Sequence, residues 1–194
     1  MARKARVTAS PEQQEQAILD AASVEFTENG VRAANMDAIA TAAGVSRSTL
    51  YRRFPSKDNL LIALANATFE RGMARLETAV DGLSPRDAVV EAFAQGADLV
   101  NSDPLLHRMV LEDYEIRSVT ATMSTLFIDM VTARVAATLR EAGAAMPEKD
   151  LLDAVQIHVR LVISYLEVPL TEEAERSPEA MRAFAAKFLA PMIY

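Results

Sequence analysis

The sequence has no cysteine and only two histidines, His107 and His158. Without thiols, the chain cannot carry a disulfide scaffold, an iron–sulfur centre, a thiol catalyst or a cysteine zinc site. The two histidines stand far apart in the sequence and offer little basis for a histidine metal site. We therefore expect no metal and no cofactor.

Long apolar runs are also missing. No stretch approaches the roughly 18 apolar residues of a membrane-spanning helix. The basic start over residues 1–6 is not followed by the apolar segment of a secretory signal. A hydrophobic content of 51%, with only 6 Gly and 8 Pro in 194 residues, excludes a disordered or collagen-like chain. We expect a soluble, cytoplasmic protein with no membrane partner.

Charge is unevenly distributed along the chain. The net charge is −7, but residues 1–60 carry +1 and residues 61–194 carry −8. Because an acidic chain is a poor general binder of nucleic acid, any DNA contact must be local and N-terminal. Basic residues do cluster there, first in an N-terminal arm and then within residues 47–57: Arg3, Lys4, Arg6, Arg47, Arg52, Arg53 and Lys57.

Serine–proline pairs indicate three helix starts. At Ser10, Ser84 and Ser177, a good N-cap residue precedes a proline at the first helical position. Gly30 readily takes the left-handed conformation that ends a helix, and no segment has the alternating pattern of a strand. The sequence predicts an all-α fold with helices over residues 11–29, 36–43, 47–53, 57–81, 85–101, 104–112, 118–142, 148–168 and 178–190.

Residues 36–53 predict two short helices that cross at a glycine turn, a helix-turn-helix. Ala40 allows close approach, and Gly44 makes the turn. Leu50 and Phe54 share the inward face of the second helix. Its other residues point their polar groups outward, where arginine can pair with guanine and hydroxyls can reach bases or phosphates. An ordinary helical hairpin with a solvated, charged face has the same pattern, so that alternative stays open.

Three segments within residues 26–61 carry a specific pattern: FTENG (26–30), MDAIATAAGVS (36–46) and TLYRRFPSKDNLL (49–61). In them the chain resembles the tetracycline-repressor (TetR) family of bacterial transcriptional regulators. The resemblance covers about residues 11–65, and the remainder matches in length and helical character. It implies a three-helix DNA-binding domain with a basic arm over residues 1–56, joined to a larger helical effector-binding and dimerisation domain over residues 57–194.

The resemblance also implies roles for single residues. Arg47, Ser48 and Thr49 match the family's base-reading positions, and Arg52 matches a position that reaches bases in some members. The other matched positions bind the DNA backbone or cap a helix beside it: Tyr51, Lys57, Asn35 where the family often has Thr, and Arg53 in place of the commoner His. The basic arm would follow a minor groove, with a disordered tail as the alternative.

The segment 104–142 would surround an effector pocket in this family. Candidate lining residues are Met109, Tyr114, Met123, Phe127 and Met130. Methionine adapts to varied ligands, and few polar residues share this face, so the expected effector is small and lipophilic. A methionine and aromatic stripe at helical spacing is also typical of plain core, and that alternative stays open.

The last two predicted helices suit a subunit interface. The segment 148–168 is apolar around most of its circumference, so it must be buried on two sides. The resemblance implies that both helices pair with their counterparts in a second copy. The candidate interface residues are Val155, Val159, Val162, Leu166, Met181, Phe184 and Phe188. The alternative is a central helix of a monomeric bundle.

Together with these patterns, the resemblance implies a ligand-responsive transcriptional regulator. We expect a repressor that binds a near-palindromic operator in double-stranded DNA as a homodimer and is released by a small effector. Two alternatives stay open, an activator of the same fold and a helical adaptor without sequence-specific DNA binding. No phosphate loop, nucleophile elbow or histidine–glutamate zinc motif occurs, so we do not expect an enzyme.

Overall fold

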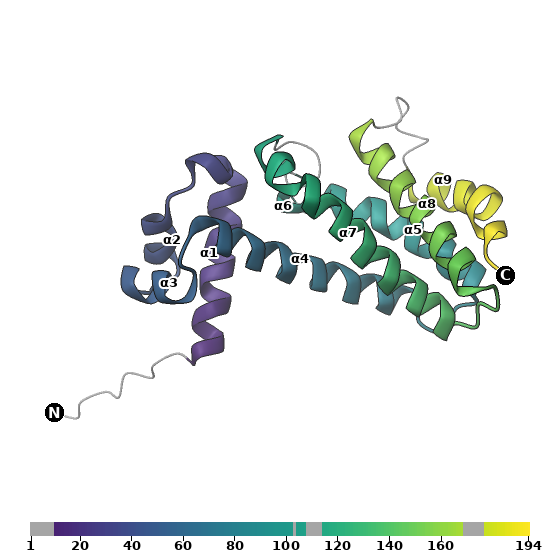
Figure 1. The fold of residues 1–194 in the computed structure, drawn as a ribbon, viewed down its shortest axis with the longest axis horizontal. Helices are drawn as coiled ribbons and strands as arrows, with labels where there is room; N and C mark the ends of the chain where they lie inside the picture. The colour runs from purple at the N-terminus through teal and green to yellow at the C-terminus, as the bar shows by residue number, and fades with distance from the viewer. Residues whose placement is uncertain (1–9, 103, 108–113, 169–176) are drawn as a thin grey trace. The chain divides into compact units, whose positions relative to one another are not determined.

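The computed structural model describes residues 10–102, 104–107, 114–168 and 177–194. These residues form helices and no β-strand, which confirms the all-α prediction (Figure 1). Over the same residues, no helix combines the length and the apolar character needed to cross a membrane. The elements are α1 (Pro11–Ala33), α2 (Met36–Ala42), α3 (Arg47–Arg53), α4 (Lys57–Val80), α5 (Pro85–Ser102), α6 (Pro104–His107), α7 (Tyr114–Glu141), α8 (Glu148–Glu167), α9 (Pro178–Phe184), the π-helical turn η3 (Ala185–Leu189) and the 3₁₀ turn η4 (Ala190–Met192).

Serine side chains start three of these helices as the sequence predicts. The Ser10 Oγ accepts a hydrogen bond from the Gln13 backbone N–H at 3.2 Å, and the Gln13 Oε1 accepts one from the Ser10 N–H at 2.8 Å. This reciprocal capping box satisfies two backbone donors that a helix start leaves free. The hydroxyls of Ser84 and Ser177 likewise accept from the N–H three residues later, at 3.3 and 3.2 Å.

Two glycines break the helical path where the sequence predicts turns. Gly30 has φ = +73° and Gly44 has φ = +66°, values that side chains other than glycine rarely adopt. Gly30 interrupts α1 at the predicted point, and one further turn over residues 31–33 follows it. Gly44 makes the tight turn between α2 and α3.

The helices predicted over residues 104–112 and 178–190 differ from their predicted ranges. The helix predicted over 104–112 is described as α6 only to His107, because residues 108–113 lie outside the described part. The helix predicted over 178–190 changes at Ala185 into the wider η3 turn and then the tighter η4 turn. Pro191 has no N–H to donate to the preceding turn, so a regular α-helix cannot continue through it.

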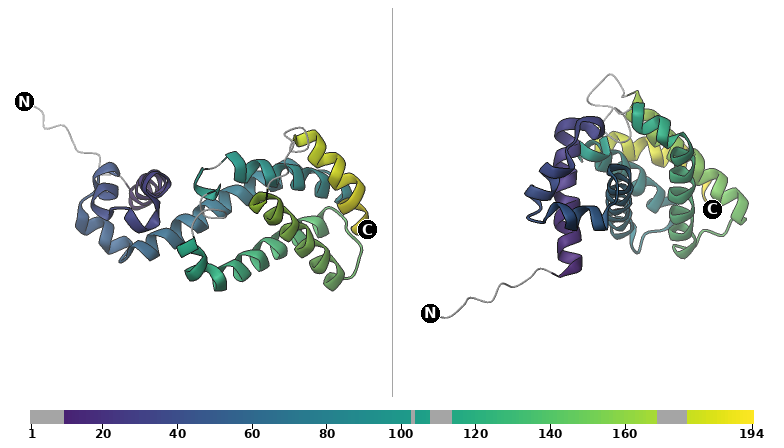
Figure 2. Two further views of the ribbon diagram at one scale, coloured as in Figure 1. Left: turned by 90° about the horizontal axis from the view of Figure 1, so that it is seen from above. Right: turned by 60° about the vertical axis from the view of Figure 1, so that its left-hand side comes forward.

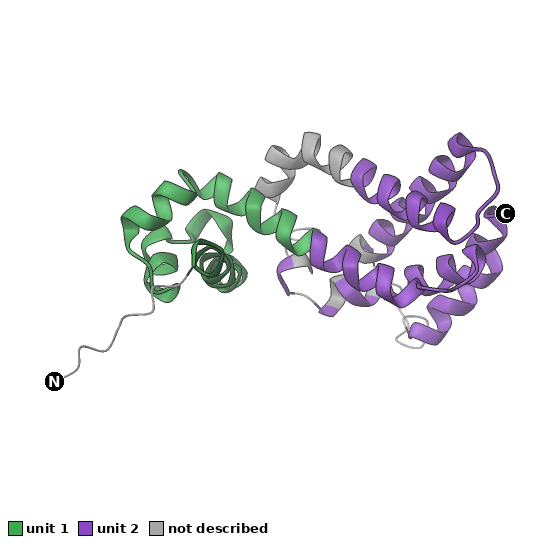
Figure 3. Cartoon of the chain, turned by 90° about the horizontal axis from the view of Figure 1, so that it is seen from below, with its two compact units in different colours: residues 1–69 green, residues 70–194 purple. Residues whose placement is uncertain are grey.

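The chain divides into two compact units, residues 1–69 and 70–194 (Figure 3). The division falls inside α4, whereas the sequence predicts a boundary at 56/57. Leu60 and Leu64, in the first turns of α4, are fully buried. This part of the helix therefore contributes to the core of the first unit.

The second unit has a continuous apolar core built around α5. This helix contacts α7, α8 and α9, and α7 and α8 pack against each other (Figure 2). The Phe93 ring of α5 stacks on Phe184 of α9 at 5.9 Å between centroids and meets Tyr165 of α8 edge-on at 6.4 Å. Aromatic pairs in these arrangements add to the stabilisation from burial alone.

A two-pronged ion pair joins α5 to α9. The Arg182 Nε donates to Glu91 Oε2 at 2.8 Å, and its Nη2 donates to Glu91 Oε1 at 3.0 Å. The Arg182 guanidinium, helped by a hydrogen bond from Gln95, lowers the pKa of the Glu91 carboxyl from 4.5 to about 2. The folded state therefore favours the ionised carboxylate.

This pair makes part of the stability depend on pH. Because folding lowers the pKa of Glu91, its carboxylate stabilises the folded state at pH values above 4.5, the pKa in the unfolded chain. This contribution is lost as the pH falls toward 2. We expect Glu91→Gln to unfold at lower urea concentration than the wild type at pH 7, with the difference shrinking between pH 4.5 and 2. Urea denaturation across this range measures it, and the exposed Glu141→Gln is the control. A difference that stays constant with pH would contradict the assignment.

Candidate nucleic-acid interface

The first unit holds α3 against α1 and α2 through apolar side chains. Ile18, Phe26, Ile39 and Leu50 are at most 1% exposed. Leu50 is the buried residue of α3, and it fixes which face of this helix points inward. Most of the other side chains of α3 consequently point away from the core.

The outward face of α3 carries most of the predicted DNA-binding residues. Arg47, Ser48, Tyr51 and Arg52 are exposed, and Thr49 is half-buried. They lie within two turns of one helix, so the structure brings them together as the sequence predicts.

Hydroxyl groups gather at the start of α3. The Ser46 Oγ lies 2.9 Å from the Ser48 Oγ and 2.8 Å from the Thr49 Oγ1, and it accepts a hydrogen bond from the Thr49 N–H at 3.1 Å. Ser46 therefore caps the helix and also orients two hydroxyls to which the resemblance gives a base-reading role.

Arg47 is held by two neighbours. Its Nε forms an ion pair with the Asp37 Oδ1 of α2 at 2.9 Å. Its guanidinium carbon lies 5.7 Å from the centroid of the Tyr51 ring, within the range of a cation–π contact. Sequence reasoning missed Asp37, because no local spacing rule connects residues on two different helices.

Arg53 differs from its neighbours in α3, because its side chain is only 19% exposed. Its Nη1 donates to the Glu15 Oε2 of α1 at 2.9 Å, and its Nε is buried with no hydrogen-bond partner among the described residues. The side chain therefore ties α3 to α1, a structural task that the sequence did not indicate.

Asn35 and Lys57 lie at helix ends. The Asn35 Oδ1 accepts from the Asp37 N–H at 2.8 Å and the Ala38 N–H at 3.4 Å, so it caps α2 as predicted. The Lys57 Nζ donates to the Arg32 carbonyl at 2.9 Å, near the end of α1. The basic arm with Arg3, Lys4 and Arg6 lies outside the described residues.

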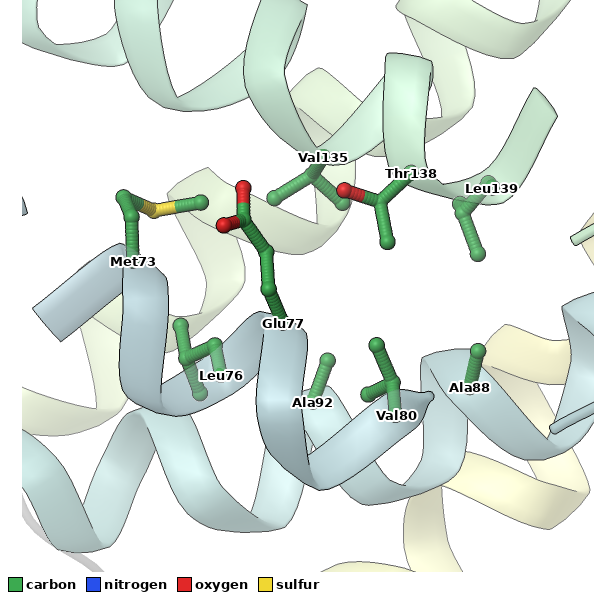
Figure 4. Close-up of a pocket in the computed structure, with 9 residues that line it drawn as sticks. All are labelled: Met73, Leu76, Glu77, Val80, Ala88, Ala92, Val135, Thr138 and Leu139. Carbon is green, nitrogen blue, oxygen red and sulfur yellow. The ribbon is translucent and has the colours of Figure 1, made fainter. Parts of the chain in front are cut away.

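Most of the predicted effector pocket also lies outside the described residues. This holds for Met109 and for the side chains of Tyr114, Met123 and Phe127, while Met130 is exposed on α7. The second unit has a small apolar crevice of about 20 Å³ between α4, α5 and α7, and none of the predicted pocket residues lines it (Figure 4). Its volume holds about one water, far below the roughly 300 Å³ of a ligand site.

Glu77 is the charged residue that lines this crevice, and an arginine of α7 binds it. The Arg134 Nε donates to Glu77 Oε1 at 2.5 Å and its Nη2 to Glu77 Oε2 at 3.1 Å, while its Nη1 donates to Glu70 at 3.2 Å. These bonds join α4 to α7 within the second unit. Both carboxylate oxygens of Glu77 are thus already occupied.

Of the two histidines, only the side chain of His158 is described, and it offers no exposed polar group to a pocket. His158 of α8 is buried, and burial lowers its pKa to about 4, so the ring is neutral at pH 7. The side chain of His107 lies outside the described residues.

The predicted interface residues differ in their exposure to solvent. Val155 and Met181 are buried in the core of their own chain, which corrects the expectation that they face a partner. Val159, Val162 and Phe184 are half-buried. Phe188 is 52% exposed, and the side chain of Leu166 lies outside the described residues. Ile157 of α8, which was not predicted, is 50% exposed.

Models of protein families match both units. The model for bacterial regulatory proteins of the tetR family matches residues 18–64. The model for the bacterial tetracyclin repressor C-terminal domain matches residues 85–187. Together these matches cover the helix-turn-helix and most of the second unit.

Individual proteins match over different lengths. The chain is 39% identical over 76 residues to the HTH-type transcriptional regulator UidR of Escherichia coli K12, so the match spans 39% of either chain. It is 27% identical over 165 residues to the HTH-type transcriptional repressor KstR of Rhodococcus jostii, which covers 85% of this chain and 76% of that one. The crystal structure of the regulator FadR from Bacillus subtilis, in complex with stearoyl-CoA, has a TM-score of 0.64 at 18% identity and covers 92% of this chain and 99% of that one.

Proposed function

The chain belongs to the tetR family of bacterial regulatory proteins, and from this premise we propose that it represses transcription by binding a near-palindromic operator as a homodimer. The observation that carries the proposal is the outward face of α3, where arginine, hydroxyl and tyrosine side chains stand exposed beside one another. Side chains of these types read base edges and bind phosphates in a major groove.

The proposed DNA contacts divide by chemistry. Arg47, Ser48, Thr49 and Arg52 read bases, because they occupy the first turns of α3 and its outward face. The backbone contacts come from Tyr51, Asn35 and Lys57. Phosphate contacts of this kind fix the position of a recognition helix without selecting sequence. Arg53 acts indirectly, because its pair with Glu15 fixes α3 on α1.

A homodimer explains why a near-palindromic operator is expected. Two copies related by a two-fold axis present two α3 helices, and they read half-sites about one helical turn, or roughly 34–36 Å, apart. The exposed apolar residues Ile157 and Phe188 on the C-terminal helices support pairing through α8 and the α9–η3 segment.

The proposed effector is a small lipophilic molecule bound in the second unit. FadR, which has a similar fold, holds stearoyl-CoA, and KstR is named a repressor. Such a ligand releases DNA only if it binds the non-DNA conformation more tightly than the DNA-bound one. The ion pairs of Arg134 give α4 and α7 a connection through which a change near α7 would reach α4.

The proposal is tested by selecting bound sequences from random duplex DNA. We expect a near-palindromic site, and log affinity for it should fall with log salt by about 0.9 per phosphate contact. Arg47→Ala should weaken this site by roughly 5- to 150-fold, the value of a good arginine–guanine pair. The control is Arg75→Ala, which removes an exposed arginine from the second unit.

Two outcomes would contradict the proposal. Failure to enrich any site, with weak binding that Arg47→Ala leaves unchanged, would favour a helical adaptor. A reporter gene whose promoter contains the selected site then tests the sign of regulation. Expression that rises when the protein is present would identify an activator.

A further inference from the structure

The guanidinium of Arg47 has two neighbours. Its Nε pairs with the Asp37 Oδ1 at 2.9 Å, and its Cζ lies over the Tyr51 ring, 5.7 Å from the ring centroid. The terminal Nη1 and Nη2 groups make no hydrogen bond to any described residue. Both side chains of the ion pair are exposed, so this terminal edge is open to a ligand.

Guanine fits this open edge. Its N7 and O6 accept two parallel hydrogen bonds from one arginine in the major groove. The Nη1 and Nη2 donors point in nearly the same direction from a planar group, so they match these two acceptors. The Nε donor is not needed for this end-on arrangement, and a carboxylate can therefore remain on it while guanine is bound.

The carboxylate of Asp37 also has a disadvantage at a DNA-binding surface, because it repels phosphates. Removing it would raise affinity for any duplex. Its placement beside Arg47 offers a compensating benefit. A free arginine side chain loses conformational freedom when it binds a base, and a neighbour that already orders the side chain reduces this loss.

We propose that Asp37 is a positioning residue for guanine recognition, holding Arg47 so that its terminal amino groups face a guanine in each half-site. The proposal rests on the proposed function, since it requires α3 to read DNA. The Tyr51 ring, over which the Arg47 guanidinium lies, also limits the orientations that this guanidinium can adopt. Docking on DNA removes water from the pair, which strengthens an interaction that is weak in water.

The test measures discrimination separately from affinity. Selection with the wild type and with Arg47→Ala identifies the base pair whose preference depends on Arg47. Four duplexes that differ only at this base pair, and one unrelated duplex, are then titrated with the wild type and Asp37→Asn. We expect Asp37→Asn to bind the unrelated duplex more tightly and yet to prefer guanine about 2- to 12-fold less, the effect of ordering one long side chain.

Asp58→Asn is the matched control, because it removes one exposed negative charge from the first turn of α4. It should leave the guanine preference unchanged. Circular dichroism checks that each variant is folded. The guanine preference is the ratio of one variant's affinity for the guanine duplex to its affinity for the other three duplexes, so a general change in affinity cancels.

Three results would overturn the proposal while leaving the regulator function intact. The Arg47-dependent base could be other than guanine, or Asp37→Asn could keep the full guanine preference. A changed preference at a different base pair would mean that Asp37 contacts a base itself. Failure of selection to yield any site would instead contradict the proposed function.

Discussion

Phe188→Glu is expected to convert the protein into a monomer that binds the full operator about 100- to 10,000-fold more weakly, because the second half-site is no longer tethered to the first. Phe188 is 52% exposed although its ring contacts Phe184 at 5.1 Å between centroids. In a dimer formed through this surface the new carboxylate would be taken out of water, and desolvating a charge costs several kcal/mol.

Sedimentation velocity measures the monomer, and titration of full and half operators measures the loss of binding. The variant should bind a single half-site as the wild-type monomer would, since the first unit is untouched. Val24→Glu places the same charge at an exposed apolar position of α1 and should leave the oligomeric state unchanged. A Phe188→Glu protein that remains dimeric would locate the interface elsewhere on the chain.

Helix positions were predictable because local chemistry sets them. Ser10 caps α1 through atoms only three residues away, and Gly44 turns the chain through its own positive φ. Such signals act over a few residues and are independent of packing. The end of α9 was less predictable, because a change to π-helical and 3₁₀ turns depends on how the helix meets its neighbours as well as on Pro191.

Residue roles were less predictable where they depend on contacts distant in sequence. The resemblance implies a contact of Arg53 with the DNA backbone, and the structure adds that its side chain pairs with Glu15 of α1, 38 positions earlier. Val155 and Phe188 are both apolar residues of the last helices, and only the packed structure separates the buried one from the exposed one. A helical apolar pattern says that a face is buried, but it does not say whether the covering surface belongs to the same chain.

Leu50→Ala is the second change with a large expected effect. Leu50 is fully buried, and it is the residue through which α3 enters the core of the first unit. Truncating a buried leucine to alanine costs about 2–5 kcal/mol, which combines lost apolar burial with the cavity that remains. The free energy of unfolding of a whole domain is only about 5–15 kcal/mol. The small first unit would therefore lose a large share of its stability.

The outcome should be local, because the core around α5 in the second unit does not contain Leu50. We expect hydrogen exchange to accelerate in α1–α3 but not in α5 and α8, and operator binding to fall while the dimer persists. Leu50→Met keeps the volume and should cost less than about 1.5 kcal/mol, so it should retain DNA binding. Equal loss of protection in both units would show that they unfold as one, and unchanged operator binding by Leu50→Ala would mean that α3 does not depend on this anchor.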